Sequence, residues 1–219
     1  MAIPFLKVST FTLKFINLIK NIIFDLGGVL LDIDFKKTAA AFEQLGVDNF
    51  ETLYSQNAAN SLFEDLETGA IDHENFYQQV QQYCKAGTSF SDIQQAWNQI
   101  LIGFRLPSLQ YLQGLKERYS LYLLSNTNGI HKKSFEETLM KATGHATLDF
   151  FFTKTYYSHL MQRRKPYKNT YRFVLENAGI TPGETLFIDD SVTNVQGAAR
   201  AGLKTHLLLP EEKIELLNL

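Results

Sequence analysis

Short runs of apolar residues, most of them followed at once by polar residues, recur along this chain. Runs of three to five apolar residues without alternation are typical of strands that are buried on both faces, as in a parallel sheet. The pattern predicts five strands: residues 21–24 followed by Asp25, residues 121–124 followed by Ser125 and Asn126, residues 185–188 followed by Asp189 and Asp190, residues 205–209, and residues 150–152.

Helical patterns lie between these predicted strands. Apolar residues recur every three or four positions in residues 107–119, 169–178 and 192–201, which is the spacing of one helix face. Strands that alternate with helices predict βαβ units, in which helices cover both faces of a parallel sheet. The expected fold class is therefore α/β, with a Rossmann-like parallel sheet as its core.

The stretch from residue 35 to residue 106 has a different pattern. It is rich in Gln, Asn, Glu and Ala, it has no strand-like run, and Gly46, Gly69 and Gly87 punctuate it as helix C-caps do. Helical spacing occurs in residues 37–45, 58–66, 75–84 and 92–102. We expect a small all-helical domain at 35–106, inserted after the first strand of a core domain made of residues 21–34 and 107–219.

The first twenty residues form an N-terminal extension that is apolar and basic. Lys7, Lys14 and Lys20 interrupt it, so it is a poor membrane-spanning helix, which needs about 20 predominantly apolar residues. It also lacks the small-residue cleavage site of a signal peptide. Two interpretations stay open: a leader segment that packs on the protein or at an interface, and a translation start assigned too early.

Composition narrows the class of protein. Apolar residues make up 45% and charged residues 20% of the chain, which are ordinary values for a globular protein and exclude intrinsic disorder. A net charge of −2 predicts no general attraction to nucleic acid or to an anionic membrane. The single cysteine, Cys84, excludes an internal disulfide and fits a reducing compartment such as the cytoplasm.

The polar residues that follow the predicted strands are candidates for one shared site, because ligands of open α/β sheets bind at the carboxyl ends of the strands. These residues are Asp25, Ser125, Asn126, Asp189 and Asp190, with Lys165 shortly before the next predicted helix. Close carboxylates repel each other unless a cation neutralises them, and Mg²⁺ suits carboxylates and phosphates. In such a site an aspartate can attack phosphorus, while Ser125, the Asn126 amide and Lys165 hold the phosphoryl oxygens.

Each signal also has a purely structural interpretation. Asp25 can be a turn residue, Asp190 and Ser191 can cap the following helix, residues 125–129 can form a plain turn, and residues 163–165 can be a solvated basic face. The order of the signals favours a shared site, because each lies at the end of a buried run or just before a helix.

In this order and spacing, the motifs resemble those of the haloacid dehalogenase superfamily. The resemblance rests on residues 24–30, 124–127, 165–166, and 187–194 followed by 197–202. It extends from about residue 21 to residue 209, and the helical insertion lies where that family has its cap. Residues 32–35, the run at 125–128 and Arg105 further resemble bacterial sugar phosphatases of the α-D-glucose-1-phosphate phosphatase type.

The resemblance implies a Mg²⁺-dependent phosphatase that hydrolyses a small phosphorylated metabolite, such as a sugar 1-phosphate, through an aspartyl-phosphate. The implied roles are Asp25 as nucleophile and metal ligand, the Gly27 carbonyl as metal ligand, Asp190 as the second carboxylate ligand with Asp189 beside it, Ser125 and Asn126 as phosphoryl-binding residues, Lys165 as the charge-balancing residue, and Asn194 as a brace of the metal loop.

One position departs from the family pattern. Most phosphatases of the superfamily have a second aspartate two residues after the nucleophile, which protonates the leaving group, and here that residue is Gly27. A general acid contributes about 10²–10⁴-fold, so we expect an enzyme that favours acidic leaving groups, as a sugar 1-phosphate has. Asp32 and Asp34 are candidate substitutes, although solvated turn acids are the simpler interpretation.

Two other hypotheses stay open. A metal-independent haloacid dehalogenase is disfavoured by the Asp189–Asp190 pair, whose charges would be uncompensated. A binding or regulatory protein that kept the fold without turnover is supported only by Gly27. Substrate specificity is expected in the helical insertion, where the candidates are residues 66–70, Tyr54, Trp97 and Arg105, although aromatic residues at helical spacing are more often core.

Overall fold

A computed structural model describes residues 19–48, 50 and 62–219 of the 219-residue chain. The predictions for residues 1–18, for Tyr54 and for the first part of the helical segment at 58–66 lie outside the described residues. Among the helices that are described, none has the length and apolar character needed to span a membrane.

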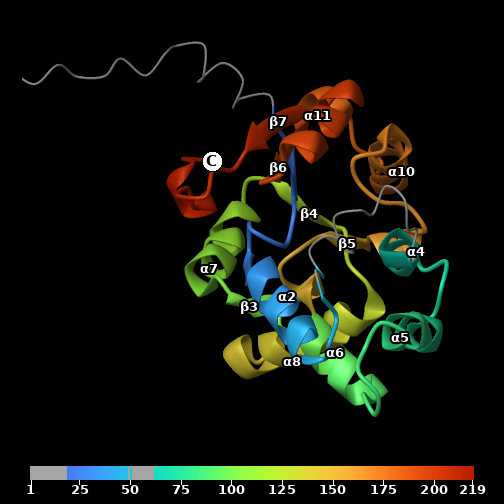
Figure 1. Ribbon diagram of the computed structural model, residues 1–219. Coiled ribbons are helices and arrows are strands. Elements are labelled where there is room, and N and C mark those ends of the chain that lie inside the picture. The colour runs from blue at the N-terminus through green and yellow to red at the C-terminus, as the bar shows by residue number, and fades with distance from the viewer. Residues whose placement is uncertain (1–18, 49, 51–61) are drawn as a thin grey trace, which may run out of the picture.

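A five-stranded parallel sheet forms the centre of the fold (Figure 1). From one edge to the other its strands are β5 (Lys154–Tyr157), β4 (Ser120–Ser125), β1 (Asn21–Phe24), β6 (Thr185–Asp189) and β7 (Lys204–Leu207). Every residue of the central strand β1 is buried, because its neighbours cover both edges and helices cover both faces. The α/β class with a parallel sheet is therefore confirmed.

Alternate residues of β1 pack on opposite faces of the sheet. Ile22 and Phe24 belong to one hydrophobic cluster, together with Leu112 of a flanking helix, and Ile23 belongs to a second cluster with Tyr171. The helices outside the insertion are α7 (Leu106–Leu115), α8 (Gly129–Thr143), α9 (Ser158–Met161), α10 (Lys168–Ala178) and α11 (Val192–Arg200), with 3₁₀ turns at Leu148–Phe150, Pro182–Glu184 and Ile214–Leu216. The three helices predicted from spacing correspond to α7, α10 and α11.

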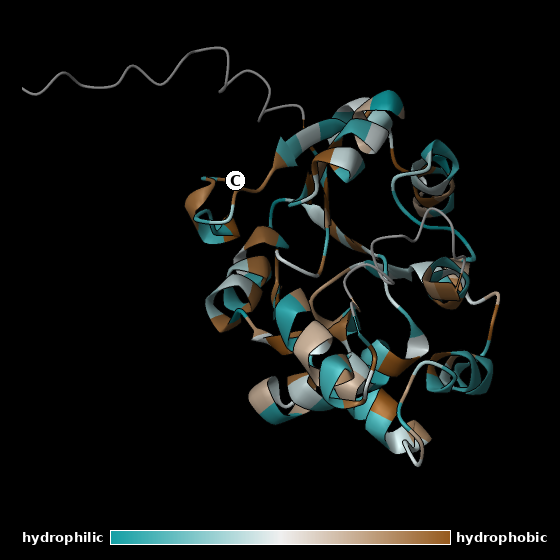
Figure 2. Ribbon diagram, in the orientation of Figure 1, coloured by the Kyte–Doolittle hydropathy of each residue, from teal (hydrophilic) through white to brown (hydrophobic). Residues whose placement is uncertain are grey.

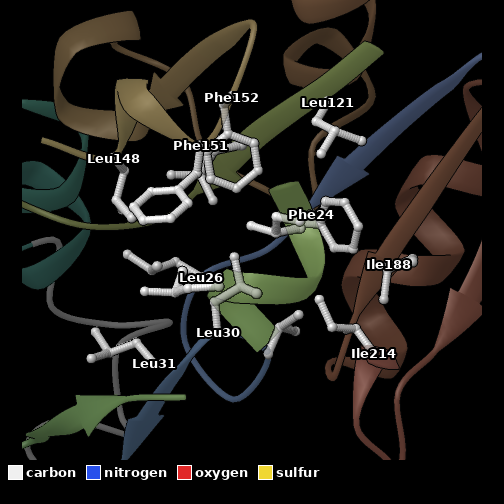
Figure 3. Packing of buried hydrophobic residues seen from close by; sticks show 14 of the residues in the cluster. Phe24, Leu26, Leu30, Leu31, Leu121, Leu148, Phe151, Phe152, Ile188 and Ile214 are labelled. Carbon is white, nitrogen blue, oxygen red and sulfur yellow. The ribbon is translucent and has the colours of Figure 1, made fainter. Parts of the chain in front are cut away.

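The prediction of a strand at residues 150–152 was wrong. This segment ends a 3₁₀ turn, and the edge strand β5 begins only at Lys154. Phe151 and Phe152 are buried in the cluster around Phe24 (Figure 3), where the rings of Phe24 and Phe152 have centroids 6.4 Å apart. Two of the three aromatic residues therefore fill the core, Phe150 stays exposed, and the edge strand β5 that follows lacks an apolar run.

The helical insertion has its own hydrophobic cluster. Its described helices are α2 (Phe35–Gln44), α4 (Leu62–Thr68), α5 (His73–Gln81) and α6 (Phe90–Asn98), and in Figure 2 they show hydrophilic and hydrophobic sides. Trp97 is buried in this cluster among aromatic and aliphatic side chains, so it is a core residue. Gly46 and Gly69 have φ values of 87° and 69° and follow the ends of α2 and α4, as expected of glycines that end helices. The prediction that Gly87 ends a helix was wrong, because α5 ends at Gln81 and Gly87, with a φ of 87°, lies in the turn that follows.

A two-stranded antiparallel ribbon joins the insertion to the sheet. It pairs β2 (Leu31–Ile33) with β3 (Leu101–Phe104), so the prediction of a helix reaching residue 102 was wrong: α6 ends at Asn98. Arg105 fastens the ribbon, because its Nε donates to Asp32 Oδ1 at 2.6 Å and its Nη1 donates to the Val29 carbonyl at 3.1 Å. The domain boundaries at 34/35 and 106/107 stay a prediction.

Candidate active site

The carboxyl ends of β1, β4 and β6 lie side by side, because β1 pairs in parallel with both of the other strands. Asp25 directly follows β1, and its N–H donates to the Ile188 carbonyl of β6 at 2.9 Å. Ser125 is the last residue of β4 and Asp189 is the last residue of β6. The structure thus brings together the strand-end residues that the sequence placed at one edge of the sheet.

Lys165 connects two of these carboxylates. Its Nζ lies 2.7 Å from Asp25 Oδ1 and 2.7 Å from Asp189 Oδ2, and its side chain is 1% exposed. Burial by itself lowers the pKa of Lys165, but the carboxylates of Asp189 and Asp25 outweigh burial and raise that pKa above its ordinary value. Lys165 is therefore a buried ammonium group that neutralises one negative charge of the cluster.

Asp189 is fully enclosed by hydrogen-bond donors. The Asn194 side chain donates to both of its carboxylate oxygens at 3.1 Å, and the Ser191 N–H donates to Oδ1 at 2.8 Å. With Lys165 on Oδ2, each oxygen accepts two bonds. Asp189 thus orients Lys165 and the turn before α11, and Asn194 holds this turn through its bonds to Asp189. The role of Asn194 beside a metal stays a prediction.

The side-chain amide of Asn126 is bound to the backbone of Lys165. Its Nδ2 donates to the Lys165 carbonyl at 3.0 Å, and its Oδ1 accepts from the Lys165 N–H at 2.9 Å. This two-bond pairing fixes the backbone that carries the buried ammonium. The contact of Asn126 with a phosphoryl group stays a prediction, and in this geometry the side chain of Asn126 positions Lys165.

Asp190, unlike Asp189, faces the open cavity beside Asp25. Its carboxylate lies against Gly28, where φ is 71° and an added Cβ would be 2.0 Å from Asp190 Oδ2. Burial and the charge of Asp189 raise the pKa of Asp190. Gly28, whose role the sequence analysis missed, leaves the space that this carboxylate occupies.

The three carboxylates lie close enough together to hold a metal ion, and Asp189 among them already accepts two hydrogen bonds at each oxygen. Asp25, Asp189 and Asp190 each offer an oxygen, and these oxygens lie within 4.8 Å of one another. Burial and the neighbouring Asp189 raise the pKa of Asp25 to about 8, since Lys165 offsets only one of the three charges. A hard divalent cation fits this oxygen-rich, negatively charged group and would favour its ionised form.

A cavity of about 330 Å³ opens over this cluster. It is lined from the sheet edge by Asp25, Gly27, Ser125, Lys165 and Asp190, and from the insertion by residues that include Phe35 and Glu67. Glu67 belongs to the segment 66–70 that the sequence favoured for specificity, and it lies in the last turn of α4 rather than in a loop. Nothing in the sequence singled out His131, which also lines the cavity.

Three other predicted candidates lie elsewhere. Arg105 and Asp32 pair with each other in the β2–β3 ribbon, and Asp34 caps α2 by accepting from the Lys36 N–H at 2.9 Å. None of the three is among the described residues that line the cavity. The simpler interpretation of Asp34 as a turn acid is therefore correct.

Comparisons with known proteins agree with this geometry. Residues 19–202 match the model of the haloacid dehalogenase-like hydrolases. A D-ribitol-5-phosphate phosphatase of Bacteroides thetaiotaomicron is 31% identical over 188 residues, which cover 86% of this chain and 91% of that protein.

Two solved structures are also similar. A HAD family enzyme of Bacteroides thetaiotaomicron, in complex with magnesium and inorganic phosphate, has a TM-score of 0.81 and 32% identity over 92% of this chain and all of that chain. A predicted HAD-like family hydrolase from Porphyromonas gingivalis has a TM-score of 0.81 and 32% identity over 89% of this chain and 93% of that chain.

Proposed function

We propose that this chain, which belongs to the haloacid dehalogenase-like hydrolase family, is a Mg²⁺-dependent phosphatase that hydrolyses a small phosphorylated sugar or polyol. The observation that carries the proposal is the buried Lys165 ammonium, which joins Asp25 to Asp189 at the base of a cavity that Asp190 also lines. This arrangement supplies a nucleophile, a positive charge for a phosphoryl group and the carboxylates of a metal site.

Asp25 is the nucleophile in this proposal. Among the described residues, the donors to its carboxylate, Leu26 N–H at 2.7 Å and Lys165 Nζ at 2.7 Å, both lie at Oδ1. Oδ2 is thereby left as the oxygen that attacks phosphorus to form an aspartyl-phosphate. Because the two donors hold the carboxylate in one orientation, the attacking oxygen is positioned before substrate binds.

Asp25, the Gly27 carbonyl and Asp190 would hold Mg²⁺, with Asp189 fixing the surrounding turn. When bound, Mg²⁺ supplies positive charge that offsets the carboxylates and stabilises the phosphoryl oxygens. Lys165 and Ser125 bind the same oxygens from the protein side, and the Asn126 side chain keeps Lys165 in place. These groups are preorganised for the charge that develops during transfer.

Two observations bear on the substrate. The cavity of about 330 Å³ is at the small end of small-molecule sites, which span about 300–1,000 Å³. Gly27 leaves the usual acid position empty, which favours an acidic leaving group such as that of a sugar 1-phosphate. The relative that acts on D-ribitol 5-phosphate instead supports a phosphorylated polyol with an alcohol leaving group, so both belong in the proposed substrate range.

A panel of phosphorylated metabolites tests this function. We expect release of inorganic phosphate in the presence of Mg²⁺ from a sugar 1-phosphate or a polyol phosphate, and loss of that release with a chelator. Asp190→Ala is the variant that corresponds to treatment with a chelator, since it removes a proposed metal ligand that lies near the protein surface. It should lose phosphate release as the chelated protein does. A Mg²⁺-binding chain that hydrolyses no phosphoester is a binding protein, and chelator-insensitive release of halide from haloacids indicates a dehalogenase.

A further inference from the structure

The proposed reaction needs a proton donor for the leaving group, and Gly27 cannot supply one. Five titratable side chains line the described part of the cavity: Asp25, Asp190, Lys165, Glu67 and His131. The first three carry the nucleophile, the metal site and the charge balance of the proposed function. The remaining candidates for the missing acid among these five residues are therefore His131 and Glu67.

His131 is excluded by its hydrogen bonds. Its Nε2 lies 3.1 Å from the Trp97 carbonyl, which can only accept, so Nε2 carries the proton. Its Nδ1 then accepts from the Asn128 amide at 3.2 Å. Burial lowers the pKa of His131 to about 4, so the ring is neutral at physiological pH and both of its nitrogens are already bonded inside the protein.

Glu67, unlike His131, has a side-chain oxygen that makes no hydrogen bond within the described protein. It lies near the end of α4, its side chain is 16% exposed, and its buried Oε2 makes no hydrogen bond to any described residue. Arg164 Nε is 3.1 Å away but is not aligned to donate to it. A buried carboxyl oxygen that has an ion pair but no hydrogen bond, in a wall of the cavity that also contains the nucleophile, can still take up a proton or bind a ligand.

Burial and the surrounding charges together raise the pKa of this carboxyl group. Burial raises the pKa of Glu67, Arg164 and Lys165 act to lower it, and Glu64 on the same helix acts to raise it, with a net increase. On the helices packed against α4, the titratable residues His73, Glu74 and His159 line a different cavity together with Leu66 and Gly69. The remaining one, Tyr77, packs its ring against Phe76 and Phe90.

The position of Glu67 is fixed by the packing of α4 on α9. A Cβ added at Gly69, where φ is 69°, would lie 2.5 Å from the His159 carbonyl oxygen. Only a glycine permits this close approach of the two backbones. The end of α4 is therefore held against the loop that carries Arg164 and Lys165, and Glu67 is held over the site as part of the folded structure.

We propose that Glu67 is the general acid and base of this enzyme, an inference that rests on the proposed phosphatase function. In the first step Asp25 attacks phosphorus, the bond from phosphorus to the ester oxygen breaks, and that oxygen takes the proton of the Glu67 carboxyl group. In the second step the Glu67 carboxylate takes a proton from water, which attacks the aspartyl-phosphate. Inorganic phosphate and the Asp25 carboxylate are released, and Glu67 is protonated again.

Two phosphate esters of similar size test this assignment. The leaving group of p-nitrophenyl phosphate is acidic and needs no proton, whereas that of phenyl phosphate is much more basic. We expect Glu67→Gln to lower kcat/KM for phenyl phosphate by about 10²-fold or more, within the range of general acid catalysis. It should change kcat/KM for p-nitrophenyl phosphate little, because kcat/KM reports the steps up to release of the leaving group and not the later attack of water. The decline of the wild-type rate at high pH should also disappear in this variant.

Glu64→Gln is the matched control, because Glu64 lies one turn away on α4 and contacts the same arginine at 3.4 Å. It should leave the maximal kcat/KM of both esters unchanged and only shift the pH dependence for phenyl phosphate to lower pH, because the Glu64 charge raises the pKa of Glu67. Glu67→Asp, which keeps a carboxyl group, should recover part of kcat/KM for phenyl phosphate. Equal effects of Glu67→Gln on kcat/KM for the two esters, or no effect on either, would overturn the assignment. A wild-type protein that hydrolyses neither ester contradicts the phosphatase function itself.

Discussion

The close contact between Gly28 and Asp190 makes Gly28→Ala a sensitive probe of the proposed metal site. The Cβ of an alanine would lie 2.0 Å from Asp190 Oδ2 and 2.6 Å from its Cγ. Because no such contact is tolerated, the Asp190 side chain has to leave its position. The substitution therefore displaces a proposed Mg²⁺ ligand without removing any carboxylate from the protein.

The size of the effect follows from two separate contributions. The φ of Gly28 is 71°, and a left-handed conformation costs an alanine roughly 1–2 kcal/mol. Moving Asp190 off its rotamer costs about 0.5–1.5 kcal/mol more. We expect a loss of stability of about 2–3 kcal/mol from these two contributions, and a loss of Mg²⁺ affinity of about 10- to 100-fold, as for other substitutions that disturb the support of a metal ligand.

Two further glycines separate these contributions. At Gly87, φ is 87° and an added Cβ meets nothing within 4 Å, so Gly87→Ala carries the conformational cost alone. At Gly27, φ is not positive and the Cβ approaches only the flexible end of Ile33 at 3.1 Å. Stability is measured by urea unfolding, and Mg²⁺ affinity by calorimetry and by the Mg²⁺ dependence of phosphate release.

Gly28→Ala should weaken Mg²⁺ binding, whereas Gly87→Ala should be destabilised with normal affinity. Gly27→Ala, which lies at a proposed metal-ligand position, is compared for stability alone and should be close to the wild type. If Gly28→Ala loses no more stability than Gly87→Ala and binds Mg²⁺ as the wild type does, Asp190 is not a ligand of the metal and the proposed site is incorrect.

Three other substitutions test separate parts of the account. Asp25→Asn should lower phosphatase activity more than about 10³-fold, because an amide is a poor nucleophile and a weaker metal ligand; a near-normal rate of phosphate release would contradict its role. Gly27→Asp, in a Glu67→Gln background, should recover part of the lost rate for phenyl phosphate, up to the roughly 10²–10⁴-fold ceiling of a general acid; a folded, Mg²⁺-binding double variant without recovery argues against a missing proton donor. His131 has a pKa of about 4 in the folded protein and about 6.5 when unfolded, so the unfolded chain binds a proton first and stability falls as the pH drops from 6.5 toward 4. Urea unfolding at pH 7 and pH 5 measures this loss: in His131→Asn the difference in unfolding free energy between the two pH values should be smaller than in the wild type by about 2 kcal/mol. An equal difference in both proteins would contradict a buried neutral histidine.

The strands that could be predicted from the sequence are those marked by a continuous run of apolar residues. β1, β4 and β6 are buried on both faces, so their apolar runs identify them. β5 is an edge strand whose first two residues, Lys154 and Thr155, are not buried, and it was therefore missed in favour of the aromatic run before it. Helix α8 was missed because it begins directly after the polar residues 125–128, which have the composition of a turn.

The residues that make up the candidate site could be predicted from the sequence, but the directions in which their side chains point could not. Parallel strands place their carboxyl ends together, and this is enough to gather Asp25, Ser125 and Asp189. Sequence spacing does not say which of two adjacent aspartates is enclosed by donors and which faces the cavity, because that depends on the turn before α11. The position of Glu67 depends on the contact between α4 and α9, two segments distant in the chain, and no local pattern contains it.

The phosphorylated intermediate tests the central claim most directly. The protein is mixed with Mg²⁺ and p-nitrophenyl phosphate, quenched in acid within the first turnover, and examined by mass spectrometry of its peptides. The account predicts one phosphoryl group on Asp25 in the wild type and none at this position in Asp25→Asn. Phosphate release by a wild-type protein that carries its phosphoryl group on another residue, or unimpaired release by Asp25→Asn, would contradict it.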